Sequence, residues 1–426
     1  MKDNEVVILG AGISGVSAGY HLKLDGHTST VYEKDSEWGG LCGNFTIDGF
    51  RFDKAVHLSF AASKHVQELF KKSTEINIHK PDAYNYYKGA WLKHPAQNNL
   101  APLAVDEKVK IITDFIKNST IEHKNVTNYE EWLRAQYGDY FAENFPMKYT
   151  RKYWTVEASE LSTTWCGARW YQPSIEEVLE GAFTTETPNT YYAKEMRYPK
   201  YGGYKSFLTY MANDCNIKVN KKAIAIDTNS KQVSFEDGTQ VDYSNLVSSL
   251  PLPYLISILN DVPKEVIEAS EKMYASSVAI VSLGFSKPDV PEYLWYYIYD
   301  EDFLSARCYS PSMKSADNVP DGCSSVQFEI YFSRERGLAL EGDELINHIV
   351  DKGITMGLFN KEDIIVKDMR ILPYGNVVFY KGMEDDRKIV DDFLDSVKIN
   401  RVGRFGQWKY LWTDQALLTG RNIKLK

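Results

Sequence analysis

The most restrictive feature of the sequence is a glycine pattern directly after its first apolar run. Residues 6–9 are Val-Val-Ile-Leu, and Gly10, Gly12 and Gly15 follow in the spacing Gly-x-Gly-x-x-Gly before a helix-compatible segment. This order predicts a strand, a tight turn and a helix. The first glycine permits the turn, the second lets a pyrophosphate approach the backbone, and the third lets helix and strand pack closely. The pattern therefore predicts a Rossmann-type phosphate-binding turn.

An acidic residue stands where such a site needs one. A second predicted strand over residues 29–32 ends at Glu33, which lies 18 residues beyond Gly15. This is near the separation at which a carboxylate accepts hydrogen bonds from ribose hydroxyls, so a dinucleotide site is favoured over a glycine-rich turn with a structural role only. The pair Gly39-Gly40 resembles the glycines that follow the ribose acid in FAD-binding folds of the glutathione-reductase type. We therefore expect FAD rather than NAD.

The remaining pattern predicts a cofactor domain that is interrupted twice. Residues 216–253 read as two strands, an Asp-Gly turn, a third strand and a buried strand, and Gly403 opens a late segment that resembles the element closing over FAD. Segments 106–118 and 129–145 carry apolar residues at helical spacing, whereas residues 275–375 hold short β-rich runs. We predict an α/β fold, in which a discontinuous Rossmann-type FAD-binding domain carries an inserted helical lobe and an antiparallel β-sheet substrate domain. The predicted units are 1–85, 201–274 and 376–426 for the FAD-binding domain, 86–200 for the helical lobe and 275–375 for the sheet.

Composition limits the partners. The chain has 426 residues, 43% of them hydrophobic and 25% charged, as is typical of compact globular proteins. Its 49 Lys and Arg against 58 Asp and Glu give a net charge of -9, so there is no general positive field. We therefore expect neither nucleic acid nor an anionic membrane as a partner.

The cysteines and apolar runs predict the compartment. Five cysteines without a Cys-x-x-Cys pair predict reduced thiols and no metal site. The segment before the first strand leaves no room for a secretory signal, and the apolar stretch 246–259 is too short for a membrane span. We expect a cytoplasmic protein, and a homo-oligomer is left open.

Six further islands of sequence contain residue types suited to a flavin and to an anionic, aromatic ligand. Arginine can donate paired hydrogen bonds to a diphosphate, and aromatic rings can stack a base. The islands are Asp53-Lys54-Ala55-Val56-His57, Trp91 to Asn99, residues 145–154, Trp165-Cys166-Gly167-Ala168-Arg169, residues 295–297 with 306–311, and Gly403 to Tyr410. Together they resemble the flavin-dependent UDP-galactopyranose mutase family, most closely its eukaryotic-type branch, within the FAD-binding amine-oxidase-like superfamily.

The resemblance implies roles for individual residues. As catalytic residues it implies His57 beside the flavin ring, and Arg169 and Arg307 on the substrate diphosphate. The implied substrate-binding residues are Gln97, Phe145, Tyr149, Thr150, Trp154, Trp295, Tyr297, Tyr309, Tyr410 and Asp414. The implied cofactor-binding residues are Gly10, Gly12, Ser14, Gly15, Glu33, Lys34, Gly40, Leu41, His57, Gly403 and Arg404.

The activity implied by the resemblance is the isomerisation of a UDP-linked sugar between pyranose and furanose forms, in the synthesis of cell-surface glycan precursors. The N5 atom of reduced FAD would be the nucleophile, and Arg169, Arg307 and Tyr410 would stabilise the leaving diphosphate. One alternative is an FAD-dependent oxidase or dehydrogenase of the amine-oxidase or protoporphyrinogen-oxidase type, which would need an aromatic cage or a broad apolar cavity. A flavin-binding protein without catalysis is the other.

Four positions depart from the family's pattern. Val56 stands for a glycine, Asn376 for a tyrosine, Trp412 for an acid of the short bacterial members, and Asp414 for an asparagine of the eukaryotic type. A carboxylate that faces a diphosphate is repulsive unless it is paired. The identity of the sugar and the nucleotide therefore stays open, as does the natural reductant.

Overall fold

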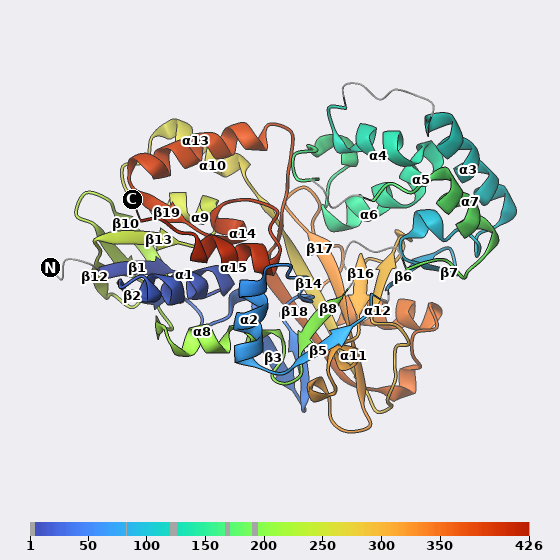
Figure 1. The fold of residues 1–426 in the computed structure, drawn as a ribbon, viewed down its shortest axis with the longest axis horizontal. Coiled ribbons are helices and arrows are strands. Elements are labelled where there is room, and N and C mark those ends of the chain that lie inside the picture. Colours follow the sequence, from blue (N-terminus) through green and yellow to red (C-terminus); the bar gives the residue numbers. More distant parts are fainter. Residues whose placement is uncertain (1–4, 82, 120–125, 167–170, 190–194, 426) are drawn as a thin grey trace.

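The computed structural model describes residues 5–81, 83–119, 126–166, 171–189 and 195–425. Figure 1 shows three parts: a parallel sheet with its helices on the left, a larger sheet beside it, and a lobe of helices at the upper right. This arrangement confirms the predicted α/β fold.

The parallel sheet is built from strands that lie far apart in the sequence. Its order is β19-β13-β1-β2-β9, and every neighbouring pair is parallel. The first and last parts of the chain lie side by side, since α1 (Ile13–Leu24) packs against α15 (Thr413–Arg421) (Figure 1). The cofactor fold is therefore discontinuous, as predicted. In sheet order the strands are β19 (Ile399–Arg401), β13 (Asn245–Ser248), β1 (Glu5–Leu9), β2 (Thr28–Tyr32) and β9 (Asn216–Lys218).

A small antiparallel unit follows β9 and confirms the strands predicted for this segment. The turn between its second and third strands contains Gly238 at φ +81°, in the left-handed region that glycine adopts at little cost. The strands are β10 (Ala223–Asp227), β11 (Gln232–Phe235) and β12 (Gln240–Asp242).

The larger sheet has seven strands, and it extends beyond the predicted boundaries. Residues 83–93 form the hairpin β6-β7, with Lys88 and Gly89 in its turn at φ +49° and +81°. Because β6 pairs in parallel with β15, the sheet is mixed at this edge rather than wholly antiparallel as predicted. In order the strands are β18 (Ile364–Val377), β14 (Ala275–Phe285), β17 (Ser324–Phe332), β16 (Arg307–Tyr309), β15 (Trp295–Ile298), β6 (Ala83–Tyr87) and β7 (Ala90–Lys93).

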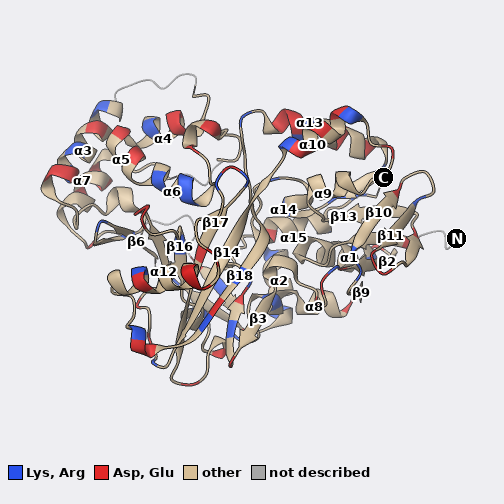
Figure 2. Ribbon diagram, turned by 180° about the vertical axis from the view of Figure 1, so that it is seen from behind, with Lys and Arg blue, Asp and Glu red and all other residues tan. Residues whose placement is uncertain are grey.

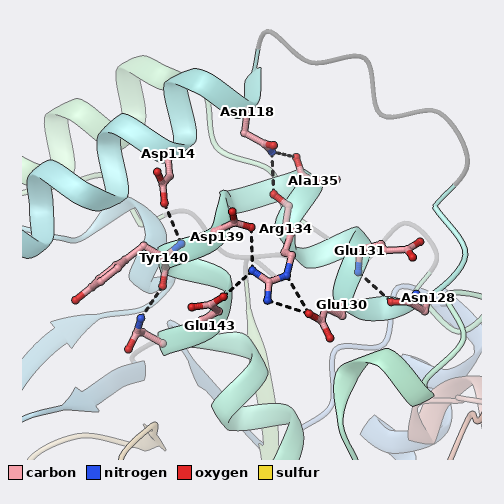
Figure 3. Close-up of polar contacts among 11 residues, drawn as sticks. Asp114, Asn118, Asn128, Glu130, Glu131, Arg134, Ala135, Asp139, Tyr140 and Glu143 are labelled. Atoms are coloured by element: carbon pink, nitrogen blue, oxygen red, sulfur yellow. Dashed lines mark hydrogen bonds and ion pairs between the residues drawn. The ribbon is translucent and has the colours of Figure 1, made fainter.

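The helical lobe lies where the periodicity predicts it, with one difference. Segment 129–145 is broken at Gly138, whose φ of +77° ends one helix and starts the next. Asp114 Oδ2 of helix α3 (Val105–Ser119) accepts a hydrogen bond from the Tyr140 N–H of helix α5 (Asp139–Asn144) at 3.1 Å, which joins the two helices (Figure 3). The helices are α3 (Val105–Ser119), α4 (Tyr129–Tyr137), α5 (Asp139–Asn144), α6 (Pro146–Tyr153) and α7 (Ile175–Phe183).

The remaining elements cover the sheets or connect them. Helix α12 (Gly342–Thr355) contributes Leu345 and Ile349 to an apolar cluster with β14 and β17. The others are α2 (Lys64–Ser73), α8 (Thr209–Asn213), α9 (Leu252–Ser257), α10 (Lys264–Lys272), α11 (Pro311–Lys314), α13 (Met383–Ser396), α14 (Gly403–Gly406), β3 (Asn44–Ile47), β4 (Phe50–Asp53), β5 (Ile76–His79) and β8 (Met196–Pro199).

Candidate functional site

One cavity of about 660 Å³ is shared by the three parts of the fold. Its wall combines the glycine turn after β1, the loop after β4, helix α6, strand β15 and the segment before α15. It therefore brings together most of the predicted cofactor and substrate residues. The predicted residues that line it are Gly10, Gly12, Ser14, Glu33, Lys34, Gly40, Leu41, His57, Tyr149, Thr150, Trp154, Trp295, Tyr297, Arg307, Gly403, Arg404 and Tyr410.

The glycine turn has the geometry that its spacing predicts. Gly10 has φ +92°, and a methyl group added at Gly15 would lie 1.9 Å from the carbonyl oxygen of Gly10, so the helix packs this closely only with glycine. At Gly12 an added methyl group would come no nearer than 4.0 Å to the Gly40 Cα. Gly12 and Ser14 both line the cavity, so the N-terminus of α1 faces it. Such a helix start suits a pyrophosphate.

Glu33 is held rigidly at the end of β2. One carboxylate oxygen accepts the Ala11 N–H at 2.7 Å and the other accepts the Asp35 N–H at 3.0 Å. The side chain is buried and lines the cavity beside the glycine turn. This placement suits the predicted contact with ribose hydroxyls.

The second glycine pair and the late segment meet at the same turn. Gly39 forms a parallel bridge with Gly12 and donates its N–H to the Ala11 carbonyl at 2.9 Å. Gly403 has φ +83°, and a methyl group there would lie 2.4 Å from Ser14 Oγ. The turn at residues 10–15, the pair Gly39-Gly40 and Gly403 therefore form a narrow groove, called the glycine cradle below, which side chains at these positions would fill. These residues fit FAD.

His57 lies on the loop after β4 and lines the cavity. Its Nδ1 is 2.9 Å from the Ala55 carbonyl, and because a carbonyl only accepts, Nδ1 carries the proton. The ring packs on Tyr204, with 4.8 Å between centroids. Burial lowers the pKa of His57 to about 4, although the nearby Asp53 carboxylate raises it. The imidazole is therefore neutral at physiological pH, with Nε2 as an acceptor.

A buried polar network lies behind this loop, and no sequence pattern predicted it. Asp53 accepts hydrogen bonds from the Tyr198 hydroxyl at 2.8 Å and the Tyr204 N–H at 3.1 Å. Lys314 Nζ lies 3.6 Å from Asp53 Oδ2 and 4.1 Å from the ring centroid of Tyr309. Burial lowers the pKa of Lys314 to about 8. The ion pair fixes the start of the loop that carries the histidine.

Arg307 lines the same cavity, with a partner that sequence reasoning missed. Its Nε donates to Oε2 of Glu329, and its Nη2 donates to the Tyr331 hydroxyl at 2.8 Å. Tyr331 also donates to Glu329 at 2.6 Å, and Val56 N–H donates to Oε1 at 2.8 Å. Burial would raise the pKa of Glu329, but Arg307 and these hydrogen bonds hold it below its ordinary value. In the sequence Glu329 occupies a polar position of an alternating run, between Phe328 and Ile330, so it gave no signal of its burial.

Aromatic side chains form most of the wall around Arg307. Tyr149 and Tyr153 of α6 stack with 5.3 Å between centroids, and the Arg307 guanidinium lies 5.0 Å from the Tyr153 centroid. Trp154 packs near Tyr410, with 5.8 Å between the ring centroids. This wall can hold a planar group as well as an apolar one.

Helix α6 carries basic residues (blue in Figure 2), but none of them lines the cavity. Arg151 Nε donates to Glu301 at 2.6 Å, and Lys152 Nζ donates to the carbonyls of Ile298 and Asp300 at 2.8 and 2.9 Å. These partners of Arg151 and Lys152 come from β15 and the loop after it. The sequence of the helix alone therefore could not reveal that the two charges are compensated.

A second histidine at the cavity was not predicted. His94 Nδ1 is 3.1 Å from Asn85 Oδ1, and its ring stacks on Tyr297 with 4.7 Å between centroids. Asn85 donates from Nδ2 to the carbonyls of Leu92 and Lys93, so its Oδ1 faces the histidine as an acceptor. Nδ1 of His94 therefore carries the proton. Burial lowers the pKa of this histidine to about 3.

Several predicted residues lie away from the cavity wall. Phe145 is fully buried and stacks on Phe141 at 4.5 Å, so its ring belongs to the core of the lobe. Tyr309 is also buried, and its hydroxyl donates to Gln327 Oε1 at 2.8 Å, the residue directly opposite it on β17. The others are half-buried Gln97 in a short 3₁₀ turn, Asp414 in the first turn of α15 and Gly15 inside α1. The position of the predicted Arg169 falls outside the described residues.

Three of the four unusual residues, Val56, Asn376 and Trp412, line the cavity wall, and the side chains of the last two make contacts that the family's residues could not make in the same way. Asn376 Oδ1 accepts hydrogen bonds from the Tyr153 hydroxyl at 3.2 Å and from Arg404 at 3.1 Å, so it joins α6 to the late segment that begins at Gly403. Trp412 packs on Phe60, with 5.5 Å between centroids. Both contacts add to the rigidity of the wall.

The described part of the chain contains no group of three or more His, Cys, Asp or Glu side chains that could hold a metal ion. None of its helices combines the length and the apolar character needed to cross a bilayer.

Comparisons with known proteins agree with this geometry. The sequence profile of the flavin-containing amine oxidoreductase family matches residues 13–349, which is well over half of the chain. A 1-hydroxycarotenoid 3,4-desaturase of Flavobacterium sp. (strain P99-3) is 28% identical over 132 residues, which are 28% of this chain and 27% of that protein. The chain therefore matches only about a quarter of this curated relative's length.

Solved structures match over nearly the whole chain. A reduced UDP-galactopyranose mutase has a TM-score of 0.92 at 23% identity, over 98% of this chain and 94% of that one. A putative protoporphyrinogen oxidase from Exiguobacterium sp. 255-15 has a TM-score of 0.75 at 16% identity, over 99% and 98%. These likenesses show a shared fold. Together with the profile match and the glycine cradle, they establish that the chain belongs to the flavin-containing amine oxidoreductase family and that its cofactor is FAD.

Proposed function

We propose that the protein isomerises a nucleotide-sugar between pyranose and furanose forms, as a UDP-galactopyranose mutase does. The observation that carries this proposal is Arg307, a buried guanidinium in an aromatic cavity that continues into the FAD cradle. A cation in such a place suits an anionic ligand. The structural likeness to a reduced UDP-galactopyranose mutase supports the same function.

Arg307 is held in one orientation yet keeps a donor for a ligand. Its Nε and Nη2 are fixed by Glu329 and Tyr331, whereas Nη1 has no hydrogen-bond partner within the described residues. A fixed guanidinium loses little entropy when it binds a phosphate oxygen. Because Glu329 neutralises its charge in the free protein, we expect directed hydrogen bonds to matter more than net charge.

The aromatic wall supplies the second part of nucleotide recognition. Tyr153 lies beside Arg307 and stacks on Tyr149, and Tyr410 of the same wall lies 5.1 Å from the Arg404 guanidinium, so a base and its diphosphate could be held within one cavity. The buried Trp295 lines the same wall, and its Nε1 has no acceptor within the described residues. A hydroxyl or phosphate oxygen of the substrate would satisfy this donor.

The cofactor end provides the reactive group and its environment. Gly12, Glu33 and Gly403 would hold FAD, which when bound and reduced supplies the nucleophilic nitrogen of this reaction type. The neutral His57 would face the flavin ring with its Nε2 lone pair and accept a hydrogen bond. Arg307 and Tyr410 would stabilise charge on the leaving diphosphate.

The second candidate is a flavin oxidase or desaturase acting on an apolar substrate. The aromatic wall favours it, because the cavity has more apolar than polar lining. The family match, the desaturase relative and the oxidase-like structure are consistent with it. The oxidase or desaturase candidate gives no role to the hydrogen-bond donors Arg307 Nη1 and Trp295 Nε1, which are unpaired within the described residues.

One experiment separates the two candidates. Flavin-loaded protein is reduced anaerobically with dithionite and given UDP-galactofuranose, and the products are separated by chromatography, with oxidised protein as the control. Conversion to the pyranose by reduced protein alone supports the mutase. If UDP neither binds nor changes the flavin absorbance, the nucleotide-sugar proposal fails and the oxidase candidate takes its place.

A further inference from the structure

A fully buried lysine lies beside the start of the loop that carries His57. Lys314 ends α11, its side chain has no exposed surface, and its Nζ is 3.6 Å from Oδ2 of the buried Asp53. Asp53 ends β4, and residues 54–57, which follow it, line the cavity, whereas neither member of the ion pair does. The pair therefore forms a layer of charge behind the wall of the flavin site.

The position of the lysine is fixed by its neighbours. Its backbone carbonyl accepts hydrogen bonds from Asn77 Nδ2 at 3.1 Å and His79 Nε2 at 2.9 Å, which joins the end of α11 to β5 (Figure 1). The ammonium group of Lys314 lies over the ring of Tyr309, 4.1 Å from the centroid. Both ends of the residue are therefore held, so the charge stays at one place relative to the loop.

Asp53 connects this charge with His57. Its Oδ1 accepts the Tyr204 N–H at 3.1 Å, and the Tyr204 ring packs on that of His57 with 4.8 Å between centroids. The backbone carbonyl of Asp53 accepts a hydrogen bond from Gln327 Nε2 at 3.2 Å, which holds the start of the loop on β17. The ion pair therefore acts on His57 across a short and rigid stretch of structure.

Hydrogen bonding alone does not explain why an ammonium ion is buried here. Among the described residues Nζ of Lys314 has no acceptor within hydrogen-bond distance, because the 3.6 Å to Asp53 is too long. Burying such an ion is costly, and an ion pair offsets that cost only when hydrogen bonds complete it. Titratable groups that are buried beside a ligand cavity are typical of functional sites. The lysine is therefore better explained by an effect on the cavity than by stability.

The effect of the pair on His57 has a definite sign. Burial lowers the pKa of His57, the Asp53 carboxylate raises it, the Lys314 ammonium lowers it, and Glu329 raises it. Burial lowers the pKa of Lys314 to about 8, whereas Asp53 and Glu329 raise it and Arg307 lowers it, so the lysine is mostly cationic at neutral pH. Burial also keeps the other titratable neighbours uncharged, since it raises the pKa of the tyrosines and lowers that of the histidine: Tyr198, Tyr204, Tyr309 and His79.

We propose that Lys314 is a positioning residue of the flavin site, whose buried charge offsets that of Asp53 behind the loop 54–57 and so keeps the His57 ring uncharged toward the cofactor. A neutral ring offers Nε2 as an acceptor, whereas an imidazolium would present a second donor and a positive charge to the flavin. The inference takes the placement of His57 beside the flavin from the proposed function. It holds for either candidate reaction, because it concerns the protonation of the histidine and not turnover.

The test follows the protonation of His57 in the flavin-loaded protein by NMR of ring-labelled histidine across the acid and neutral pH range, with His57→Asn to identify its signal. In Lys314→Met the carboxylate of Asp53 is left without its cation, so the midpoint of the His57 titration should rise by about one pH unit or more. Asp53→Asn combined with Lys314→Met removes both charges. This double variant should return the midpoint to the wild-type value or below it, since Asp53 has the larger effect of the two.

Lys152→Met is the matched control. Lys152 is also a buried lysine whose pKa is lowered by burial, but it lies on α6 and donates to the Ile298 and Asp300 carbonyls, so its loss should leave the His57 midpoint unchanged. The absorbance of bound flavin shows that each variant is folded. If Lys314→Met does not fold, Asp53→Asn and the double variant give the same comparison, because loss of the lysine should again raise the midpoint.

Three results would overturn the proposal. The first is an unshifted His57 midpoint in Lys314→Met, and the second is an equal rise in Lys152→Met. The third is a rise that the double variant does not reverse, which would show that Lys314 supports the loop by packing alone. A failed mutase assay is none of these, so the two proposals fail separately.

Discussion

Arg307 and Glu329 form a buried ion pair between adjacent strands of the larger sheet, where β16 and β17 set the two residues directly opposite each other. The Glu329 side chain is completely buried, whereas that of Arg307 is 14% exposed toward the cavity. The Glu329 carboxylate therefore binds the Arg307 guanidinium and is not accessible to a ligand. It is a positioning residue for the guanidinium.

We expect Glu329→Gln to destabilise the protein and loosen Arg307. The amide keeps the shape but loses the charge-assisted bond, which costs about 2 kcal/mol in the free energy of unfolding. Since the pKa of Glu329 is lowered by folding, its contribution is present above the unfolded pKa and is lost as pH falls through the lower folded value. Urea titrations of both proteins should thus differ clearly at neutral pH and converge in acid. A constant difference at all pH values would show that the charge is not responsible.

We expect Arg307→Lys to reduce turnover of the nucleotide-sugar by at least about 100-fold while the flavin stays bound, because a point charge cannot reproduce the fixed fork. Steady-state kinetics and the flavin spectrum measure the two effects. The matched control is Arg370→Lys, an exposed arginine of β18 that lies outside the cavity lining. Equal turnover in both variants would remove Arg307 from the reaction.

The neutral state of His57 predicts a pH dependence of stability. Its pKa is lowered by burial from 6.5 to about 4, so below pH 6.5 the unfolded chain binds the proton more tightly than the folded one. Stability from this residue is complete above the unfolded pKa and falls between about pH 6.5 and 4, by about 3 kcal/mol in all. His57→Asn should remove this part of the acid sensitivity. Denaturation midpoints at pH 7.5 and pH 5 give the comparison, and an unaltered slope in the variant would contradict the assignment.

The glycine cradle predicts different outcomes for neighbouring substitutions. Gly12→Ala finds room in the protein itself, so the chain should fold but bind FAD at least about tenfold more weakly, because the methyl group occupies space left for the pyrophosphate. Gly15→Ala would clash with the Gly10 carbonyl and should prevent normal folding. Gly337→Ala, with no atom within 4 Å, is the neutral control. Flavin content and thermal unfolding distinguish the three, and normal FAD affinity in Gly12→Ala would refute the cradle.

Sequence reasoning was most successful where a backbone position dictates the residue. Gly10 and Gly15 could be recognised because the turn and the helix contact leave no room for a side chain, and Glu33 follows at a set distance. A motif does not fix where each of its side chains points. Phe145 was therefore predicted in the substrate site although its ring completes a stack in the core.

Partners from distant parts of the chain explain the other differences. The charge of Arg151 is compensated by Glu301, and Asp53 at the end of β4 pairs with Lys314 at the end of α11, so neither pairing has a local sequence signal. Glu329 is conspicuous only once its strand is known to be buried on both faces. These are tertiary effects, and the sequence patterns used here report local structure.

The cradle also sets an order of events during synthesis. Gly12 is translated well before Gly403, which packs against Ser14 from 389 positions further along the chain. A nascent chain therefore lacks one wall of the flavin site until the segment around Gly403 has left the ribosome and docked. The cofactor can be enclosed only after that segment has been made, and a chain truncated before Gly403 would keep its glycine turn but have nothing to close over the flavin.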